Sequence, residues 1–409
     1  MRRVAPLAAA LLACAMPWLA GCAPSRDGLP AFYASRPRFE QPFAGQRVPK
    51  GLKSLSAEEC GSCHVAIYRE WKQSVHAQAW VDPQFRAELA KQPGVSWLCI
   101  NCHTPLVNQL DSLVVRLEGG DVERPVKRAN PRWAGAALRD EAITCAACHV
   151  RDGAVVGPFG GTNAPHATRL DPALRSADFC LRCHQAVQAY PGKTFVCTFD
   201  TGAEWKAGPF AAAGTVCQDC HMPPVERPLV AGGPVRRVGM HGWIGSHLKK
   251  GHETLPALWD SLAARRPPGV ELRADTLVRA VPGAPLAWRV RVVNVNAGHM
   301  LPTGDPERAV IVTLAAIGER GDTLAREQVR IGQKWEWWPA PRKLADERLA
   351  PGGERVLTLR VRSAPRGAWT LAATAVNERI SDANADFHRL PESYPRRAEV
   401  ARLEVRPRR

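Results

Sequence analysis

Five copies of one pentapeptide, Cys-x-x-Cys-His, dominate the chemistry that this sequence offers. Their cysteines are Cys60, Cys63, Cys99, Cys102, Cys145, Cys148, Cys180, Cys183, Cys217 and Cys220, and their histidines are His64, His103, His149, His184 and His221. On one helical turn, residues i, i+3 and i+4 share a face. Two thiols on that face can form thioethers with the vinyl groups of a porphyrin while the imidazole reaches its iron, which is the attachment pattern of c-type haem. We therefore predict five covalently attached haems c.

Structural zinc is the alternative interpretation of these motifs, because paired Cys-x-x-Cys units also hold zinc. Zinc gives no reason for a histidine after every pair, and the chain has only 12 histidines among 409 residues. Five repetitions of the full pattern therefore favour haem over zinc or disulfides.

The N-terminal residues predict export and a lipid anchor. Two arginines precede an apolar run that ends in Leu19-Ala20-Gly21-Cys22, which is typical of a lipoprotein signal peptide over residues 1–22. The run is too short for a transmembrane helix, so the predicted anchor is a lipid on Cys22. Ordinary cleavage with Cys22 as a bystander is the alternative. Ala23 stands where an inner-membrane retention signal usually has Asp, which favours the outer membrane, with the protein facing the periplasm or the cell exterior.

The formal net charge of +16 would by itself suit a nucleic acid or an anionic membrane surface. Removal of the signal peptide takes away Arg2 and Arg3 and leaves +14. Each haem carries two propionates, so five haems bring the mature protein to about +4. Much of the basicity thus has an internal use, and we expect no nucleic-acid partner.

Of the 13 cysteines, only Cys197 belongs to neither the motifs nor the signal peptide with its lipid site, and we expect it to be a small buried apolar residue.

Two regions between the signal peptide and the last third of the chain differ in composition. Residues 23–55 are rich in Pro, Arg and Gly, which predicts a flexible tether. Residues 56–265 are predicted to form a mainly α, loop-rich cytochrome c domain. A capping box at Ser56 and Glu59 places the first motif in the opening turn of a helix, and a second helix should begin at Asp82-Pro83 and end before Gly94. The motifs recur every 35 to 46 residues, so haem should form much of the core.

Residues 266–409 have a different pattern. Apolar side chains alternate with polar ones, as at Leu286, Trp288 and Val290, and this period of two marks half-buried strands. Strands are expected near residues 269–275, 286–292, 308–317, 323–331, 357–361, 368–377 and 399–405. Seven short strands in this space predict an all-β immunoglobulin-like sandwich. The predicted fold class is therefore α+β and multidomain.

Histidine must supply most of the sixth iron ligands, because the mature chain has only three methionines. Such ligation gives low potentials compared with His/Met haems. Seven histidines lie outside the motifs. His76 follows His64 by twelve residues, which is about 18 Å of rise on a continuous helix. We therefore expect His76 to ligate a neighbouring haem and not its own.

Several segments resemble a known group of proteins. The first motif, followed by Tyr68, Trp71, Ser74, His76 and Ala77, resembles the first haem segment of multihaem cytochromes related to the tetrahaem electron carrier of ammonia oxidisers. Cys99-Ile-Asn-Cys102-His103-Thr-Pro, Cys145-Ala-Ala-Cys148-His149-Val-Arg-Asp-Gly and Cys217-Gln-Asp-Cys220-His221-Met-Pro are similar to later segments of that group. The resemblance covers roughly residues 56–250.

The resemblance implies a set of distal ligands. His76, His166 and His241 are the first candidates, and His247, in the same Gly-rich loop as His241, is the fourth. His299 lies in a segment similar to one in the C-terminal β domain of such proteins. If His299 ligates the fifth iron, the β domain is held on the haem domain.

Three functions fit the sequence. The first is a lipid-anchored, extracytoplasmic electron carrier with closed irons, no catalytic residue, and other redox proteins as partners. The second is an oxidoreductase acting on a small nitrogen or sulfur compound at one open iron. Related pentahaem nitrite reductases have a Lys in place of one motif histidine, whereas all five motifs here end in His. This departure argues against nitrite reduction specifically. The third is a redox-partner-binding or sensing module in residues 266–409.

Overall fold

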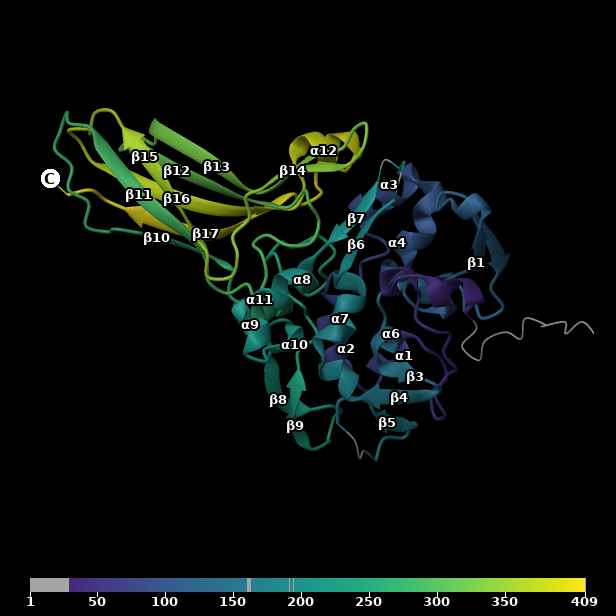
Figure 1. The fold of residues 1–409 in the computed structure, drawn as a ribbon. Helices are drawn as coiled ribbons and strands as arrows, with labels where there is room; N and C mark the ends of the chain where they lie inside the picture. The colour runs from purple at the N-terminus through teal and green to yellow at the C-terminus, as the bar shows by residue number, and fades with distance from the viewer. Residues whose placement is uncertain (1–28, 160–162, 191, 194, 409) are drawn as a thin grey trace, which may run out of the picture.

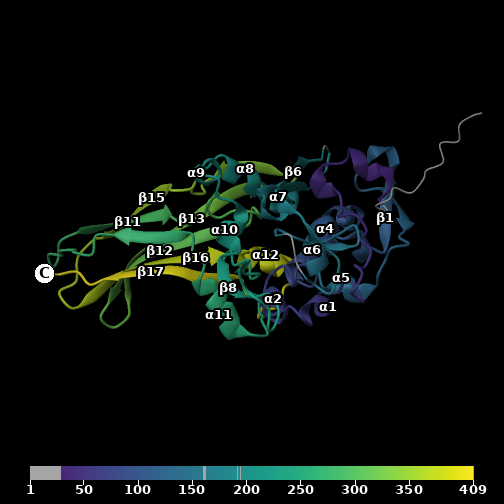
Figure 2. The same ribbon diagram turned by 90° about the horizontal axis from the view of Figure 1, so that it is seen from below.

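The computed structural model describes residues 29–159, 163–190, 192, 193 and 195–408. A helical, loop-rich part contains the five motifs, and a β part lies beside it, so that the molecule is elongated in both views (Figures 1 and 2). Within the described residues, no helix has the length and apolar character needed to cross a bilayer.

Short helices present all five motifs. Four helices end at the motif histidine: α4 (Ser96–His103), α6 (Cys145–His149), α7 (Ala177–His184) and α10 (Cys217–His221). The first motif begins in α1 (Ala57–Gly61), and His64 directly precedes α2 (Val65–Lys72). The Ser56 hydroxyl accepts a hydrogen bond from the backbone N–H of Glu59 at 3.1 Å, as the capping pattern predicted.

The other helices of this part support the motif helices. They are α3 (Pro83–Lys91), α5 (Ala136–Asp140), α8 (Thr201–Lys206), α9 (Pro209–Ala212) and α11 (Pro256–Ala264). The Asp82 carboxylate accepts from the N–H of Phe85 at 3.2 Å, so α3 begins where the Asp-Pro pair predicted. Because α3 ends at Lys91, it also stops before Gly94.

Four small sheets join the haem-motif helices, where the sequence indicated only loops. They are β1 (Ser112–Leu117) with β2 (Pro125–Ala129), β3 (Val150–Arg151) with β4 (Ala154–Gly157) and β5 (Thr168–Leu170), β6 (Ala186–Ala189) with β7 (Val196–Phe199), and β8 (Pro224–Pro228) with β9 (Val235–Gly239). Their strands are too short for a period of two to be recognised in the sequence.

The β part consists of two antiparallel sheets. One has the order β14-β13-β12-β16-β17 and the other β10-β11-β15. The strands are β10 (Val270–Ala274), β11 (Leu286–Asn294), β12 (Ala309–Gly318), β13 (Thr323–Glu336), β14 (Arg342–Asp346), β15 (Glu354–Val361), β16 (Trp369–Glu378) and β17 (Arg397–Val405), and α12 (Asp382–Phe387) follows β16. All seven predicted strands are present, and β14 is an eighth. The immunoglobulin-like topology stays a prediction.

One apolar core joins the two sheets. Val290 from one sheet and Leu314 and Leu371 from the other are fully buried in it. Burying each such side chain contributes about 1.5–3 kcal/mol, so the alternation seen in the sequence is also what holds the sheets together.

Residues 29–55 do not form the tether that the composition predicted. The Tyr33 and Phe39 side chains are buried, and the Tyr33 hydroxyl oxygen accepts a hydrogen bond from the N–H of Val114 in β1 at 3.2 Å. Glu40 is fully buried and accepts from the Tyr190 hydroxyl at 2.8 Å. This segment therefore packs on the haem-motif part, and only residues 23–28 of the proposed tether lie outside the described residues.

A buried ion pair connects the two parts of the molecule. Arg348 binds Glu204 of α8 at 2.5 Å, and each side chain is only 6% exposed. The Thr303 hydroxyl donates to the other oxygen of Glu204, also at 2.5 Å. Because Thr303 and Arg348 come from the β part, these contacts fix the loop that contains residues 296–303 against the helical part.

Candidate haem-ligand site

Four pairs of histidines face each other across the helical part. In each pair, one histidine belongs to a motif and the other does not. The ring centroids are 6.5 Å apart for His64 and His166, 6.3 Å for His184 and His76, 6.1 Å for His149 and His241, and 6.3 Å for His221 and His299. Two imidazole nitrogens held about 2 Å from one metal ion, on opposite sides, put their ring centres roughly 6 Å apart. These spacings therefore fit an iron between the rings.

Hydrogen bonds orient most of these rings. The Nδ1 atoms of His64, His149 and His221 lie 3.1, 2.9 and 3.0 Å from the carbonyl oxygens of Leu229, Val156 and Ile244, and those of His241 and His299 lie 2.9 Å from the carbonyls of Gly239 and Met300. A histidine whose Nδ1–H donates to a carbonyl keeps the lone pair of Nε2 for a metal. Such bonds are the usual outer support of ligating histidines.

Burial also keeps three of these imidazoles neutral. Burial lowers the pKa of His76 and of His241 to about 3, and that of His221 to about 4. Only the neutral ring has a lone pair to offer a metal, so at neutral pH these side chains are in the ligating form.

The structure brings together most of the candidate distal histidines. His76, His166, His241 and His299 each face a motif histidine, and His76 faces His184. The premise of a continuous helix from His64 to His76 is wrong, because α2 ends at Lys72. The expectation that His76 serves a neighbouring haem is supported by its place opposite His184.

His247 is not brought to any motif histidine within the described residues. Its Nε2 lies 2.5 Å from the carbonyl oxygen of Arg266, so the nitrogen that would ligate is already hydrogen-bonded. Its backbone has a φ of 57°, which turns the loop after the segment that places His241. We therefore leave His247 out of the ligand set.

His103 differs from the other motif histidines. Its Nδ1 lies 2.7 Å from the carbonyl oxygen of Ala79, and burial lowers its pKa to about 4, so it is prepared for ligation like the others. No second histidine faces it among the described residues. Phe85 of α3 instead stacks on the ring, with centroids 3.5 Å apart and planes 6° from parallel. Nothing in the sequence distinguished Phe85 from an ordinary apolar residue of a helix.

Cysteines of different motifs lie close together. The thiols of Cys60 and Cys145, of Cys102 and Cys183, and of Cys180 and Cys217 are within hydrogen-bonding reach of each other. No cysteine among the described residues forms a disulfide. Nor do the described residues gather three or more of the His, Cys, Asp and Glu side chains that a closed zinc site would need. Cysteine pairs that lie beside facing histidines suit covalent haem attachment better than they suit a closed zinc site.

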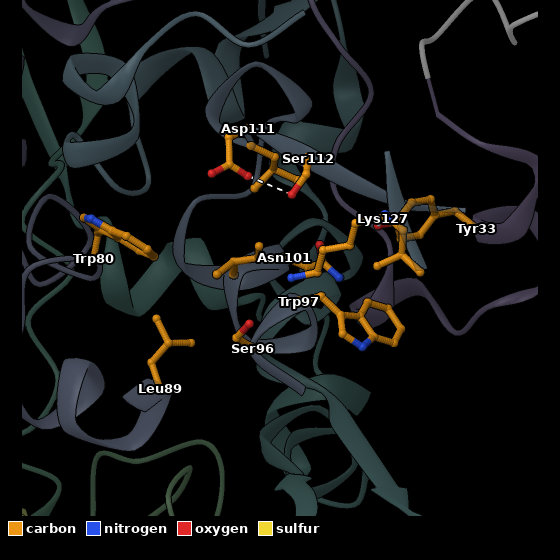
Figure 3. A pocket seen from close by; sticks show the side chains of 12 residues that line it. Tyr33, Trp80, Leu89, Ser96, Trp97, Asn101, Asp111, Ser112 and Lys127 are labelled. Atoms are coloured by element: carbon orange, nitrogen blue, oxygen red, sulfur yellow. Dashed lines mark hydrogen bonds between the residues drawn. The ribbon is translucent and has the colours of Figure 1, made fainter. Parts of the chain in front are cut away.

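A cavity of about 180 Å³ lies on another face of α4. Figure 3 shows Trp80, Trp97 and Tyr33 around it, with Asp111 and Ser112 joined by a hydrogen bond. From α4 it is lined by Ser96, Trp97, Ile100 and Asn101, and none of the motif cysteines or histidines lines it. The candidate site is therefore the set of facing histidines and not this cavity.

Two comparisons relate this chain to cytochromes of known type. A family model described as cytochrome c554 and c-prime matches residues 59–127. A solved penta-heme cytochrome c552 from Thermochromatium tepidum has 20% sequence identity and a TM-score of 0.60, and the match covers 86% of this chain and 98% of that one. The family model and the shared fold together support a multihaem c-type cytochrome family for this chain. These matches support covalently bound haem c and electron transfer in general.

Other solved structures match only part of this chain. A glycosyl hydrolase of family 2 from Bacteroides cellulosilyticus is 12% identical, covers 34% of this chain and 14% of its own, and has a TM-score of 0.17. A CARDB domain from Pyrococcus furiosus is 18% identical, covers 34% of this chain and 89% of its own, and has the same TM-score. No curated protein sequence matches the chain.

Proposed function

We propose that this cytochrome is an extracytoplasmic pentahaem electron carrier. The ten motif cysteines hold five haems c, and four irons are closed by the pairs His64–His166, His76–His184, His149–His241 and His221–His299. The four facing pairs support this proposal best, because an iron held by two histidines exchanges electrons without binding a substrate. Reversible one-electron reduction of iron is the chemistry that the haems supply.

Contacts between motifs support a continuous route through the molecule. The first and third motifs meet at Cys60 and Cys145, the second and fourth at Cys102 and Cys183, and the fourth and fifth at Cys180 and Cys217. Cys148 in the third motif is close enough to Cys180 in the fourth to act on it electrostatically, so these two motifs are neighbours as well. Every attachment site thus adjoins another, as a relay requires.

We further propose a haem domain over residues 56–265 and a β domain over residues 266–409. The β domain provides His299 to the fifth haem, which makes it a structural part of the carrier and not a separate binding module. A lipid on Cys22, which lies outside the described residues, would attach the protein to a membrane, with the outer membrane favoured. The partners would be other redox proteins, steered by the basic surface.

Reduction or oxidation of a small nitrogen or sulfur compound is the second candidate function. The observation that favours it is the difference at His103, which Phe85 covers on one side and which no histidine faces among the described residues. An iron bound by His103 alone would keep one position for a small ligand.

Ferric EPR spectra of the purified holoprotein test both functions. We expect four low-spin bis-histidine signals that ignore added cyanide, in proportion to four of the five haems. A fifth, high-spin signal that becomes low-spin with cyanide would support the second function, whereas five inert low-spin signals would exclude it. Fewer than four bis-histidine signals would contradict the proposed ligand set.

Variants at two phenylalanines refine the test of the second function. Phe85→Leu removes the ring that stacks on His103 and should change the rate of cyanide binding several-fold. Phe387→Leu is the matched control, because this side chain is 71% exposed and contacts Lys91 on the surface. Equal rates in both variants would mean that Phe85 does not control access to this iron.

A further inference from the structure

Three cations from separate segments meet where the β domain contacts the haem domain. Lys250 and Arg379 both bind the Asp82 carboxylate at 2.9 Å, and the Tyr394 hydroxyl donates to it at 3.2 Å. The Asp82 side chain is only 3% exposed. Arg308, directly before β12, is close enough to act electrostatically on Lys250. One carboxylate therefore serves as the direct partner of two of the three cations.

The positive charges of this cluster exceed the negative ones. The carboxylates that act on Arg308 are those of Asp82 and Asp305, two anions for three cations. The neighbouring Glu253 carboxylate is already bound by the backbone N–H groups of Lys250 and Gly251, at 2.7 and 2.9 Å. The Nη1 atom of Arg379 is buried and has no hydrogen-bond partner among the described residues. Burial, followed by repulsion from Arg379, lowers the pKa of Lys250 to about 8. A buried charge without a counter-charge is unfavourable, so the cluster lacks one anion.

Arg308 shows where the missing anion would lie. This residue is exposed, yet burial is the main reason that its pKa is lowered. The guanidinium is therefore open to a ligand although protein groups surround it. Its Nη1 donates to the carbonyl oxygen of Thr303 at 3.2 Å, which leaves other guanidinium N–H groups to donate.

The cluster adjoins two of the candidate haem sites. The charge of Arg308 acts on His184, and that of Lys250 acts on His76, which faces His184. Lys250 and Arg379 also act on His103. The cluster therefore lies between the haem site of the fourth motif and that of the second.

We propose that Arg308, Arg379 and Lys250 form a carboxylate-binding site for a haem propionate, supplied by the haem of the fourth motif or by that of the second. The proposal depends on the haem sites described under the proposed function. Arginine suits this role because its guanidinium donates two parallel hydrogen bonds to a carboxylate. Since Arg308 and Arg379 belong to the β domain, this domain would set the charge around a haem. Fixed positive charge favours the reduced iron, so the site raises that haem's potential.

Arg308→Gln is the best test, because it removes a cation without breaking an ion pair of the cluster. The midpoint potentials of the holoprotein would be measured by a spectroelectrochemical titration, with EPR to assign each haem. We expect the reduction equilibrium of one haem to shift about tenfold toward the oxidised form, which is 59 mV for a one-electron couple. Arg308→Lys should restore most of the shift. Arg402→Gln, an exposed residue paired with Glu399 and Glu404, is the matched control and should change no potential.

The outcomes separate the source of the carboxylate. A shift in the His184 haem assigns the propionate to the fourth motif, and a shift in the His103 haem assigns it to the second. If Arg308→Gln keeps the wild-type EPR signals and all five potentials, the proposal is wrong. If the potential instead depends on chloride or phosphate in the wild type and not in Arg308→Gln, a solvent anion occupies the site and the propionate is excluded. Absence of bis-histidine signals in the wild type would instead refute the ligand set beneath the proposal.

Discussion

Replacing Arg348 by Met should release the His299 loop from the haem domain. Arg348 and Glu204 form a 2.5 Å ion pair, and both side chains are 6% exposed. Removing the guanidinium leaves the Glu204 carboxylate buried, with the Thr303 hydroxyl as a remaining partner. Met keeps most of the side-chain volume, so the change tests charge and hydrogen bonding more than packing.

The expected effect follows from the partners that each variant leaves behind. A buried charge that loses its partner costs about 3–5 kcal/mol, which weakens docking of the loop roughly a hundredfold to several thousandfold. Glu204→Gln should cost less, about 1–3 kcal/mol, because Arg348 keeps its bond to Asp346 at 2.7 Å. The predicted order of damage is therefore Arg348→Met above Glu204→Gln.

The assay is the spin state of the haem that His221 and His299 would share. Loss of His299 from that iron should convert one low-spin signal to a high-spin signal that responds to cyanide, and His299→Ala gives the reference spectrum for full loss. Arg402→Gln removes an exposed charge of the same domain and should leave the spectrum unchanged. If Arg348→Met folds and retains every low-spin signal, the ion pair does not hold the ligand loop and the reasoning fails.

Three further tests, with four substitutions, concern other parts of the structure. His76→Ala should make the His184 haem high-spin in EPR, whereas His247→Ala should leave all five haem signals unchanged; equal effects of the two would contradict the ligand set. Burial raises the pKa of Glu307 from 4.5 to about 7, so its contribution favours folding below about pH 4.5 and is lost as the pH rises to about 7. The melting temperature of Glu307→Gln should therefore fall less between pH 5 and 7.5 than that of the wild type, and parallel curves would refute this. Leu371→Ala, at a fully buried position, should lower the free energy of unfolding by about 2–5 kcal/mol in a urea titration, and a loss below 1 kcal/mol would contradict its place in the core.

Local patterns in the sequence predicted the parts of the fold that depend on near neighbours. A haem motif needs residues within one helical turn, and the alternation around Trp288 reflects a strand with one buried face. The strand β14 was missed because its residues, Arg342–Asp346, are mostly charged or exposed and show no such alternation. Residues 29–55 were misjudged as a tether because a few buried aromatic residues, such as Tyr33, hold a segment whose composition is otherwise polar and Pro-rich.

The pairing of histidines could not be predicted in the same way. His149 and His241 come from segments that are joined only by the fold, and the spacing of either one along the chain does not indicate its partner. His247 resembled a ligand because it lies near His241, but a single turn of the backbone directs its Nε2 to the carbonyl of Arg266. Phe85 beside His103 depends on how α3 packs on α4, which no local pattern reports.

The contacts between cysteines of different motifs have a consequence for how the protein matures. A chain that reached this fold with free thiols would hold Cys60 near Cys145, Cys102 near Cys183 and Cys180 near Cys217. In an oxidising compartment, neighbouring thiols form disulfides, and a cysteine in a disulfide can no longer form a thioether. We therefore expect haem to be attached while the chain is still open. Protein exported without haem should contain disulfides between cysteines of different motifs, detectable by peptide mass mapping. The close packing of the motifs, which suits electron transfer, would then prevent haem from being attached after folding.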